Sequence, residues 1–249
     1  MESPGEPASD GEEDGARGAA VAHPLDNAIW SALTTRHAPL AEVKGRARRY
    51  PSDVSVFTAV DVLDDDGWAQ LRALAGPSGR MALSRGTLPP APPGWTEIIR
   101  ARGHQMTVTG ADLVEVDPVV VRPLTRADIG EVLALVALTR PGPFEERTIE
   151  MGRYWGHVDD DDRLLAMAGE RMHLDGYTEI SAVCTHPDAR GRGLAAALTR
   201  HVALGIVERG ETPILHVREG NDPARRLYQR LGFTDRRMVE FAFLETPPD

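Results

Sequence analysis

A glycine-rich segment in the last quarter of the chain has residue types that could hold a phosphate group. It reads Arg190-Gly191-Arg192-Gly193-Leu194-Ala195 and lies between a β-branched run and an apolar run with helical spacing. Glycine has no side chain, so a ligand can approach the backbone closely there. The first main-chain N–H groups of a helix lack partners and carry partial positive charge. The segment therefore predicts a pyrophosphate-binding turn, with an ordinary glycine-rich strand-to-helix turn as the alternative.

A second segment, which begins at Asn221, has the composition of a short helix that carries a tyrosine. Asp222 is favoured as the helix cap and Pro223 in the first turn, so we expect the helix to begin there. Gly232 would end it. Its apolar side chains recur at helical spacing, at Ala224, Leu227, Tyr228 and Leu231. In this pattern alone, the tyrosine is expected to pack in the core.

Together the two segments resemble motifs of the GNAT N-acetyltransferase superfamily. Arg190-x-x-Gly193-x-Ala195 matches that superfamily's pyrophosphate loop, Arg/Gln-x-x-Gly-x-Gly/Ala. Asn221-x-x-Ala224-x-x-Leu227-Tyr228-x-x-Leu231-Gly232-Phe233 is similar to its C-terminal motif and follows at the expected distance. The resemblance covers the chain from about residue 119 onward. It implies an acyl-CoA-dependent N-acetyltransferase that uses acetyl-CoA as co-substrate and needs no metal.

The resemblance also implies a cofactor site made largely of main chain. The main chain of Val183 and Thr185 would hydrogen-bond the pantetheine arm as a neighbouring strand does. Asn221 would contact the CoA side. The N–H groups that would hold the pyrophosphate belong to Arg190, Gly191, Arg192, Gly193, Leu194 and Ala195.

For catalysis, the resemblance implies direct attack of a primary amine on the thioester in a ternary complex. Tyr228 would face the thioester and protonate the leaving thiolate, which a phenol of pKa about 10 can do. Glu179 is the expected general base, because strand alternation places it on the same face as Ser181, Val183 and Thr185. His186 or a water chain could serve instead, and Glu179 could equally be a solvated carboxylate at the strand end. The same alternation directs Cys184 into the core.

The elements that position these residues follow from hydrophobic spacing and turn residues. We expect strands at 180–185, 213–217 and 239–244, helices at 193–209 and 223–231, and a hairpin pair at 164–168 and 171–174. Upstream, helices are expected at 40–50, 67–75, 127–138 and 144–154. Strands are expected at 54–60, 81–83, 96–101, 105–109 and 119–121.

Composition suggests how these elements divide into regions. Residues 1–22 are acidic, lack periodicity and predict a disordered tail. An N-terminal α/β region of unknown role follows at 23–110, then a linker at 111–118 and the acyltransferase-like domain at 119–249. The fold class is therefore mixed α/β, with a GNAT-like central mixed sheet flanked by helices and a smaller N-terminal α/β region.

Bulk properties exclude several classes of function. The net charge is −10, so the chain would be repelled by nucleic acid. Cys184 is its one cysteine, which excludes an internal disulfide and a cysteine-rich metal site. No apolar run is long enough to span a membrane, and the N-terminus lacks a signal-peptide pattern, so a cytoplasmic protein is expected. The sequence leaves open whether the protein forms a homodimer. It also does not identify the acceptor amine.

Two other functions fit part of this pattern. A non-catalytic acyl-CoA-binding regulatory module would keep the loop but would need neither Glu179 nor Tyr228. A nucleotide-binding protein could also use a glycine-rich loop, although this one lacks the Gly-Lys-Ser/Thr ending of a phosphate loop.

Overall fold

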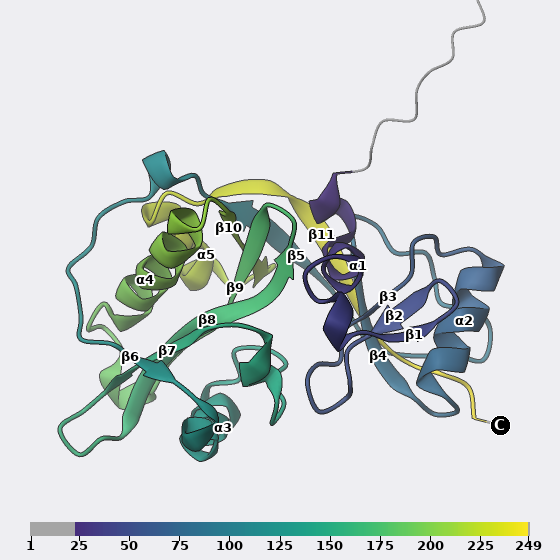
Figure 1. Cartoon of the computed structure of the whole chain (residues 1–249), viewed down its shortest axis with the longest axis horizontal. Helices are drawn as coiled ribbons and strands as arrows, with labels where there is room; N and C mark the ends of the chain where they lie inside the picture. Colours follow the sequence, from purple (N-terminus) through teal and green to yellow (C-terminus); the bar gives the residue numbers. More distant parts are fainter. Residues whose placement is uncertain (1–22, 249) are drawn as a thin grey trace, which may run out of the picture.

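The computed structural model describes residues 23–248, whose arrangement is drawn in Figure 1. Within these residues the α-helices are α1 Ala28–Thr34, α2 Asp65–Ala75, α3 Ile129–Thr139, α4 Leu194–Glu208 and α5 Asp222–Arg230. Short 3-10 helices lie at Pro24–Asn27, Ala38–Leu40, Gly110–Asp112, Arg126–Asp128, Thr148–Met151 and Pro187–Ala189. The tail predicted at residues 1–22 lies outside the described part. No helix among residues 23–248 has the length and apolar character needed to cross a membrane.

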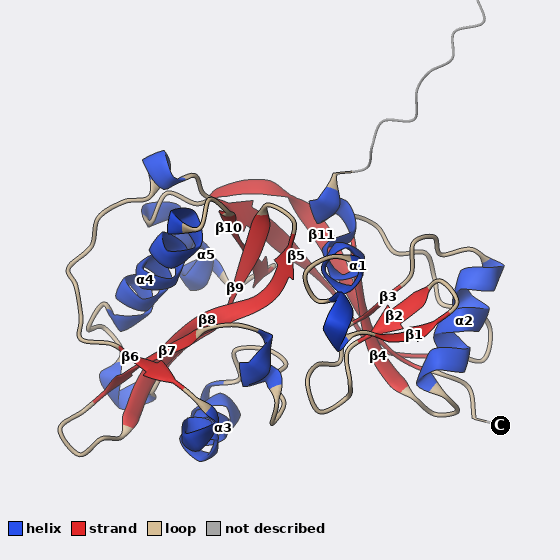
Figure 2. Ribbon diagram, viewed as in Figure 1, coloured by secondary structure: helices blue, strands red, loops and turns tan. Residues whose placement is uncertain are grey.

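The strands of the described chain form one large sheet and one small sheet (Figure 2). The small sheet contains β1 Glu42–Lys44, β2 Ala47–Arg49 and β3 Thr58–Ala59. The large sheet has the order β4-β11-β5-β10-β9-β8-β7-β6. Its strands are β4 Arg80–Arg85, β5 Thr96–Thr107, β6 Arg122–Leu124, β7 Tyr154–Val158, β8 Leu164–Leu174, β9 Tyr177–Thr185, β10 Thr212–Arg218 and β11 Thr234–Glu245. β9 and β10 are parallel, and the other neighbouring strands are antiparallel.

Helices cover both faces of the large sheet. On one face, Leu198 of α4 packs in the same core as Tyr228 of α5. On the other face, α1 packs against Met172 of β8, and α3 packs against Cys184 of β9. We call these the α4 face and the α1 face. Because side chains alternate along a strand, Glu179 and Ile180 point to opposite faces, with Ile180 on the α4 face.

Two segments predicted as helices have other structures. Residues 40–50 contain the β1–β2 hairpin, because Gly45 takes a left-handed φ of 54° at the turn. Residues 144–154 contain the 3-10 helix Thr148–Met151 and then enter β7 at Tyr154. The buried Tyr154 ring packs over Gly169 of β8. This strand pairing, distant in sequence, overrides the local helical preference.

Two other segments predicted as separate strands are continuous. Residues 164–168 and 171–174 form the single strand β8, which pairs with β9 across the turn at Asp175-Gly176. Likewise, residues 96–101 and most of 105–109 belong to the single strand β5. The strand passes through Gly103, whose missing side chain leaves room for the ring of Phe241 on β11.

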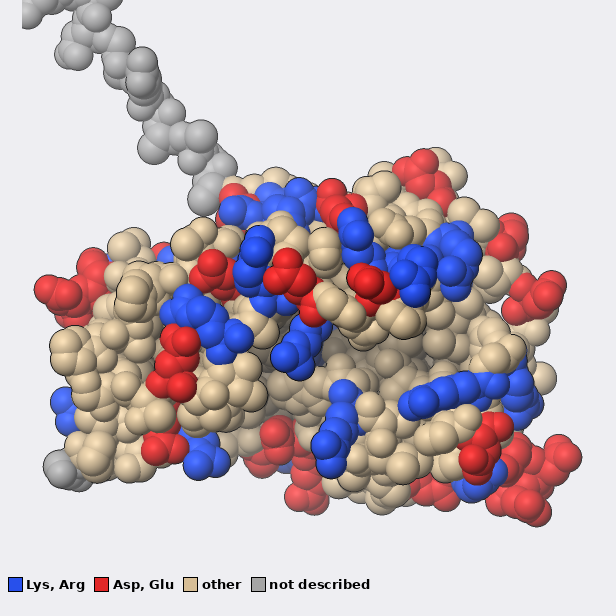
Figure 3. Space-filling view, turned by 180° about the vertical axis from the view of Figure 1, so that it is seen from behind, with Lys and Arg blue, Asp and Glu red and all other residues tan. Residues whose placement is uncertain are grey.

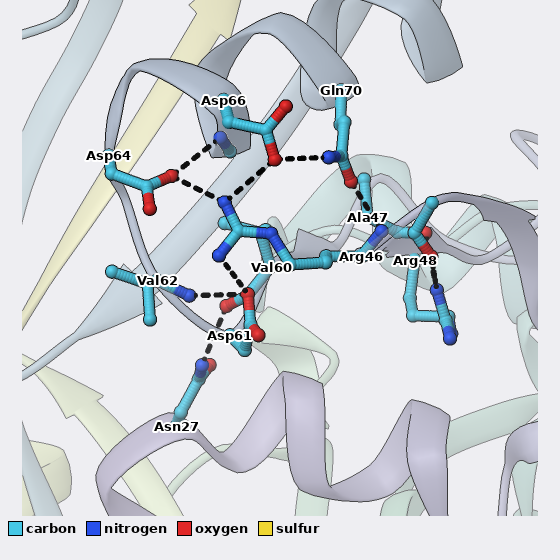
Figure 4. Close-up of polar contacts among 12 residues, drawn as sticks. Asn27, Arg46, Ala47, Arg48, Val60, Asp61, Val62, Asp64, Asp66 and Gln70 are labelled. Atoms are coloured by element: carbon cyan, nitrogen blue, oxygen red, sulfur yellow. Dashed lines mark hydrogen bonds and ion pairs between the residues drawn. The ribbon is translucent and has the colours of Figure 1, made fainter.

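The small sheet is held to α2 by a network of polar contacts (Figure 4). Arg46, at the β1–β2 turn, forms ion pairs with Asp61 at 3.3 Å, with Asp64, and with Asp66 at 3.1 Å. Asp64 also caps α2 by accepting a hydrogen bond from the Gly67 N–H at 2.7 Å. Each exposed pair contributes little alone, so the network mainly orders the loop before α2.

The N-terminal region contributes strands to the large sheet. β5 lies between β10 and β11 and pairs with both, and β4 pairs with the outer side of β11. The sheet therefore crosses the boundary predicted at residues 111–118. Whether 119–249 folds by itself stays a prediction.

Candidate active site

The candidate site lies where β9 and β10 separate. Their parallel pairing runs from Tyr177 opposite Thr212 to Ile180 opposite Leu215 and stops there. Beyond that point, β9 still pairs with β8 as far as Thr185, and β10 still pairs with β5 as far as Arg218. Each strand therefore has a free backbone edge that faces the other. An extended ligand can add to such an edge through main-chain hydrogen bonds.

A β-bulge in β9 produces this separation. Ala182 has a left-handed φ of 54°, and the register with β8 shifts between Met167 and Gly169. A bulge adds one residue to one strand and so reverses the alternation of side chains beyond it. Val183 consequently packs with the core of the α4 face, and Cys184 lies in the core beneath α3.

The bulge corrects one sequence-based prediction. Alternation had placed Glu179 on the same face as Val183 and Thr185, but the extra residue puts Glu179 and Val183 on opposite faces. Cys184 is buried in the core, as predicted. The hydroxyl of Thr185 is buried and has no hydrogen-bond partner among the described residues. An unpartnered buried hydroxyl beside the free edge of β9 fits a polar ligand there.

The glycine-rich loop connects β9 to α4 through the 3-10 helix Pro187–Ala189. Gly191 and Gly193 have left-handed φ angles of 79° and 76°, and a Cβ atom at either would meet open space. Gly193 is the N-cap residue of α4 and supplies no side-chain cap. The loop from Arg190 to Gly193 is exposed, whereas Leu194 is buried and anchors the helix. The unpartnered N–H groups of the first turn, including that of Ala195, are the donors a phosphate requires.

Positive charge gathers around a hollow on the rear of the molecule. Figure 3 shows Arg side chains along the rim of this hollow, toward the end of the molecule that carries α4 and α5. The chain as a whole is acidic, so this basic rim is a local departure from the overall charge. Such a concentration favours anionic ligands.

Tyr228 lies on α5 within the core of the α4 face. Its ring packs edge-on against Phe233, with 6.1 Å between centroids. Burial, and to a smaller degree the nearby Cys184 thiol, raises the pKa of Tyr228 to about 12. The phenol therefore stays protonated through the neutral range. Asn221 caps α5, where its side chain accepts a hydrogen bond from the Ala224 N–H at 3.4 Å. The cap is one residue earlier than the predicted Asp222.

Glu179 is completely buried on the α1 face, in an ion-pair network that the sequence did not reveal. Arg171 donates to both of its carboxylate oxygens, at 2.8 and 2.7 Å, and His216 Nδ1 lies 2.8 Å from Oε1. Burial alone would raise the pKa of Glu179. The charge of Arg171 and the hydrogen bonds from His216 and Arg171 outweigh it and bring the pKa to about 2.

These contacts make Glu179 a weak general base. Both of its oxygens are already occupied, and a carboxylate of such low pKa accepts a proton poorly. His186, the alternative base, lies outside this network. Its Nδ1 accepts a hydrogen bond from the Asp188 N–H at 3.3 Å, within its own loop.

Sequence reasoning missed Arg171 and His216. Alternation along 213–217 could have placed His216 on the face of the strand opposite to that of Leu215. Only the register of β10 with β9, however, brings His216 beside Glu179.

Comparison with known proteins supports the same interpretation of the C-terminal region. A family model described as FR47-like protein matches residues 154–242, which run from β7 into β11. A GCN5-like protein acetyltransferase of Mycobacterium tuberculosis is 33% identical over 169 residues, and the match covers 62% of this chain and 76% of that protein. The solved structure of a GNAT-family protein from Novosphingobium aromaticivorans has 36% identity and a TM-score of 0.83, covering 90% of this chain and 99% of that one.

The chain belongs to the GNAT acetyltransferase family.

Membership in the GNAT family confirms both the resemblance drawn from the two motifs and the predicted fold, a mixed sheet flanked by helices. Other relatives match only in part. A mycothiol acetyltransferase from Thermomonospora curvata is 37% identical over 92 residues, which is 36% of this chain and 31% of that enzyme. The chain thus matches about a third of the length of such relatives. Among residues 23–248, no group of three or more His, Cys, Asp or Glu side chains is arranged to hold a metal ion.

Proposed function

We propose that this protein transfers an acetyl group from acetyl-CoA to a primary amine by direct attack in a ternary complex. The observation that carries the proposal is the separation of β9 and β10 beside the N-terminus of α4. The separated strands provide a free strand edge, and the N-terminus of α4 beside them provides a cluster of unpartnered N–H donors. The names of the relatives, a protein acetyltransferase and mycothiol acetyltransferases, support acetyl transfer as the reaction.

In this proposal the cofactor is held mainly by the backbone. The pantetheine arm lies along the free edge of β9 and bonds to the main chain of Val183 and Thr185. The N–H groups from Arg190 to Ala195 hold the pyrophosphate, with the basic rim of the hollow as its electrostatic complement. Asn221 contacts the CoA side from the start of α5, in addition to capping that helix.

The chemistry joins an amine to the acetyl carbon and releases a thiol. The neutral amine forms the N–C bond, and the carbonyl electron pair moves to oxygen. When that pair returns, the C–S bond breaks and the sulfur takes the hydroxyl proton of Tyr228. The nitrogen loses one proton to a base on the α1 face, where Glu179 and the side chains bonded to it lie. Solvent then takes the proton from that base and returns one to Tyr228, so the overall reaction is balanced.

Replacing Gly193 by aspartate tests the cofactor site. The new side chain would occupy the open space at a φ of 76° and place a carboxylate beside the pyrophosphate. Two like charges about 4 Å apart repel by about 1–4 kcal/mol, so the Kd for acetyl-CoA should rise about ten- to a thousandfold by calorimetry.

Gly176→Asp is the matched control. Gly176 also has a left-handed φ, 79°, and open space at its Cβ position, but it lies in the β8–β9 turn. Its variant should bind acetyl-CoA as the wild type does. Unchanged affinity in the Gly193 variant would contradict the assignment of the loop.

An assay of thiol release from acetyl-CoA with a panel of primary amines tests the reaction itself. Release that saturates with one amine supports acetyl transfer. Tight acetyl-CoA binding without release for any amine would contradict the reaction and favour a non-catalytic acyl-CoA-binding module.

A further inference from the structure

We propose that His216 is the group that takes the proton from the acceptor amine, and that Glu179 positions it. This inference rests on the proposed acetyl transfer and assigns the base of that reaction. Its basis is the set of hydrogen bonds around His216, the position of His216 beside the separation of β9 and β10, and the small cavity that adjoins it.

The hydrogen bonds determine which nitrogen of His216 carries the proton. Nδ1 lies 2.8 Å from the Glu179 carboxylate, which can only accept, so Nδ1 is the protonated nitrogen. Arg171 fixes that carboxylate by donating to both of its oxygens. A carboxylate behind an imidazole in this way holds its tautomer and stabilises the imidazolium that forms when the ring accepts a proton.

The other nitrogen, Nε2, has a free electron pair. It lies 3.1 Å from Gln105 Nε2. Arg236 donates to Gln105 Oε1 at 2.8 Å, which fixes the orientation of the amide, and Gln105 Nε2 also donates to the Leu25 carbonyl at 3.1 Å. The amide nitrogen is thus a donor to His216 Nε2, and that ring nitrogen accepts. An amine that displaces the Gln105 amide would meet a proton acceptor.

The location of His216 suits this role. It is the first residue of β10 after the last pair with β9, at Leu215, and its side chain is 8% exposed. A small cavity of about 10 Å³, which has room for about one water molecule, adjoins it on the α1 face, with Gln105, Phe57 and Phe241 among its walls. Tyr228 lies on the opposite face of the sheet. The acceptor and the departing thiol would therefore occupy opposite sides of the reacting carbon.

The charged groups around His216 are already paired. Arg171 pairs with Glu179, and Asp26 pairs with Arg236 and Arg237, each at 2.7 Å. Arg85, which also lines the cavity, donates to main-chain carbonyls at the end of β3. Glu179 stays ionised across the neutral range because its pKa is about 2. A loss of activity on mild acidification would thus not come from protonation of this carboxylate.

The kinetic test uses His216→Asn in the full chain. Asparagine can still donate a hydrogen bond to Glu179, but it has no atom that replaces Nε2. We expect kcat with the amine found in the panel to fall about a hundred- to ten-thousandfold, with the Kd for acetyl-CoA unchanged. The acid side of the kcat/KM profile should also differ from that of the wild type.

His157→Asn is the control, because His157 lies on β7 near the edge of the sheet, with its Nδ1 bonded to the Val120 carbonyl. Wild-type activity and pH profile are expected for that variant. Equal activity and an unchanged acid limb in His216→Asn, beside an active wild type, would overturn the role of His216. A wild type that binds acetyl-CoA but acetylates no amine would instead contradict the proposed function, and the inference with it.

NMR of protein labelled with 15N-histidine tests the tautomer without an acceptor. The His216 signals, identified by their loss in His216→Asn, should show a protonated Nδ1 and an unprotonated Nε2 at neutral pH. A protonated Nε2 in the neutral ring would overturn the proposal. Glu179→Gln should shift this tautomer balance. That variant leaves the buried Arg171 without its charged partner and can unfold the chain, so the wild-type measurement decides.

Discussion

At the scale of single residues, the two faces of the sheet give the candidate acid and base opposite environments. Tyr228 sits among apolar side chains, and its hydroxyl makes no hydrogen bond to a described residue. His216 and Glu179 sit in a chain of paired donors and acceptors that continues through Arg171 and Gln105. An unpartnered phenol is free to donate to a ligand, whereas a paired imidazole is held in one tautomer.

Tyr228→Phe tests the acid at this scale. The change removes only the hydroxyl, so the sulfur would depart as an unprotonated thiolate. We expect kcat to fall about ten- to a thousandfold, with the Kd for acetyl-CoA unchanged.

The control is Tyr177→Phe, which removes a hydroxyl that forms an exposed hydrogen bond with His23 at the start of β9. The thiol-release assay should show normal turnover for it. Normal turnover in the Tyr228 variant as well would remove the tyrosine from the mechanism.

At the scale of elements, the bulge in β9 opens the site. Ala182 adopts a left-handed φ of 54°, which costs an L-residue with a side chain about 1–2 kcal/mol relative to the right-handed region. The pairing of β9 with β10 ends two residues before it. Strain of this kind persists where the surrounding structure requires it, and here it keeps two parallel strands apart.

Ala182→Val tests that role. A β-branched residue is strongly disfavoured at positive φ, and its extra methyl groups would overfill a nearly buried position. We expect the free energy of unfolding to fall by about 2–4 kcal/mol and acetyl-CoA binding to weaken as the bulge relaxes.

Ala182→Gly should stay within about 1 kcal/mol of the wild type, because the lost methyl contact offsets the relieved strain. Denaturant unfolding and calorimetry measure both variants. A valine variant with wild-type stability and affinity would show that the bulge is not needed.

At the scale of the whole molecule, the N-terminal region supplies a strand to the middle of the sheet. β5 pairs with β11 from Thr96 to Thr107 and with β10 from Gly103 to Thr107. It also carries Gln105, which bonds to His216. Without β5, both β10 and β11 would lose a paired edge that is buried in the complete chain.

Deleting residues 1–118 tests whether the C-terminal region is a separate domain. We expect the fragment 119–249 to be insoluble or unfolded by circular dichroism and to lose acetyl-CoA binding, because unpaired edges within a sheet promote aggregation. A chain that starts at residue 23 keeps all the described elements and serves as the control. A soluble fragment that binds acetyl-CoA with the affinity of the full chain would establish the predicted boundary instead.

The sequence by itself determined the features that depend on neighbouring residues. The loop of Gly191 and Gly193 and the start of α4 follow from local backbone geometry and nearby hydrogen bonds, and both lie where they were predicted. The same local motifs were enough to indicate the family.

Only the tertiary structure decided which distant strands pair and in which register. The bulge at Ala182 reversed the side-chain alternation, so Glu179 turned to the face opposite Val183. β5 entered between β10 and β11 from a region that had no assigned role. These contacts join residues far apart in the chain, and their register depends on the packing of the whole sheet. For that reason the pairing of Glu179 with Arg171 and His216 could not be derived from spacing alone.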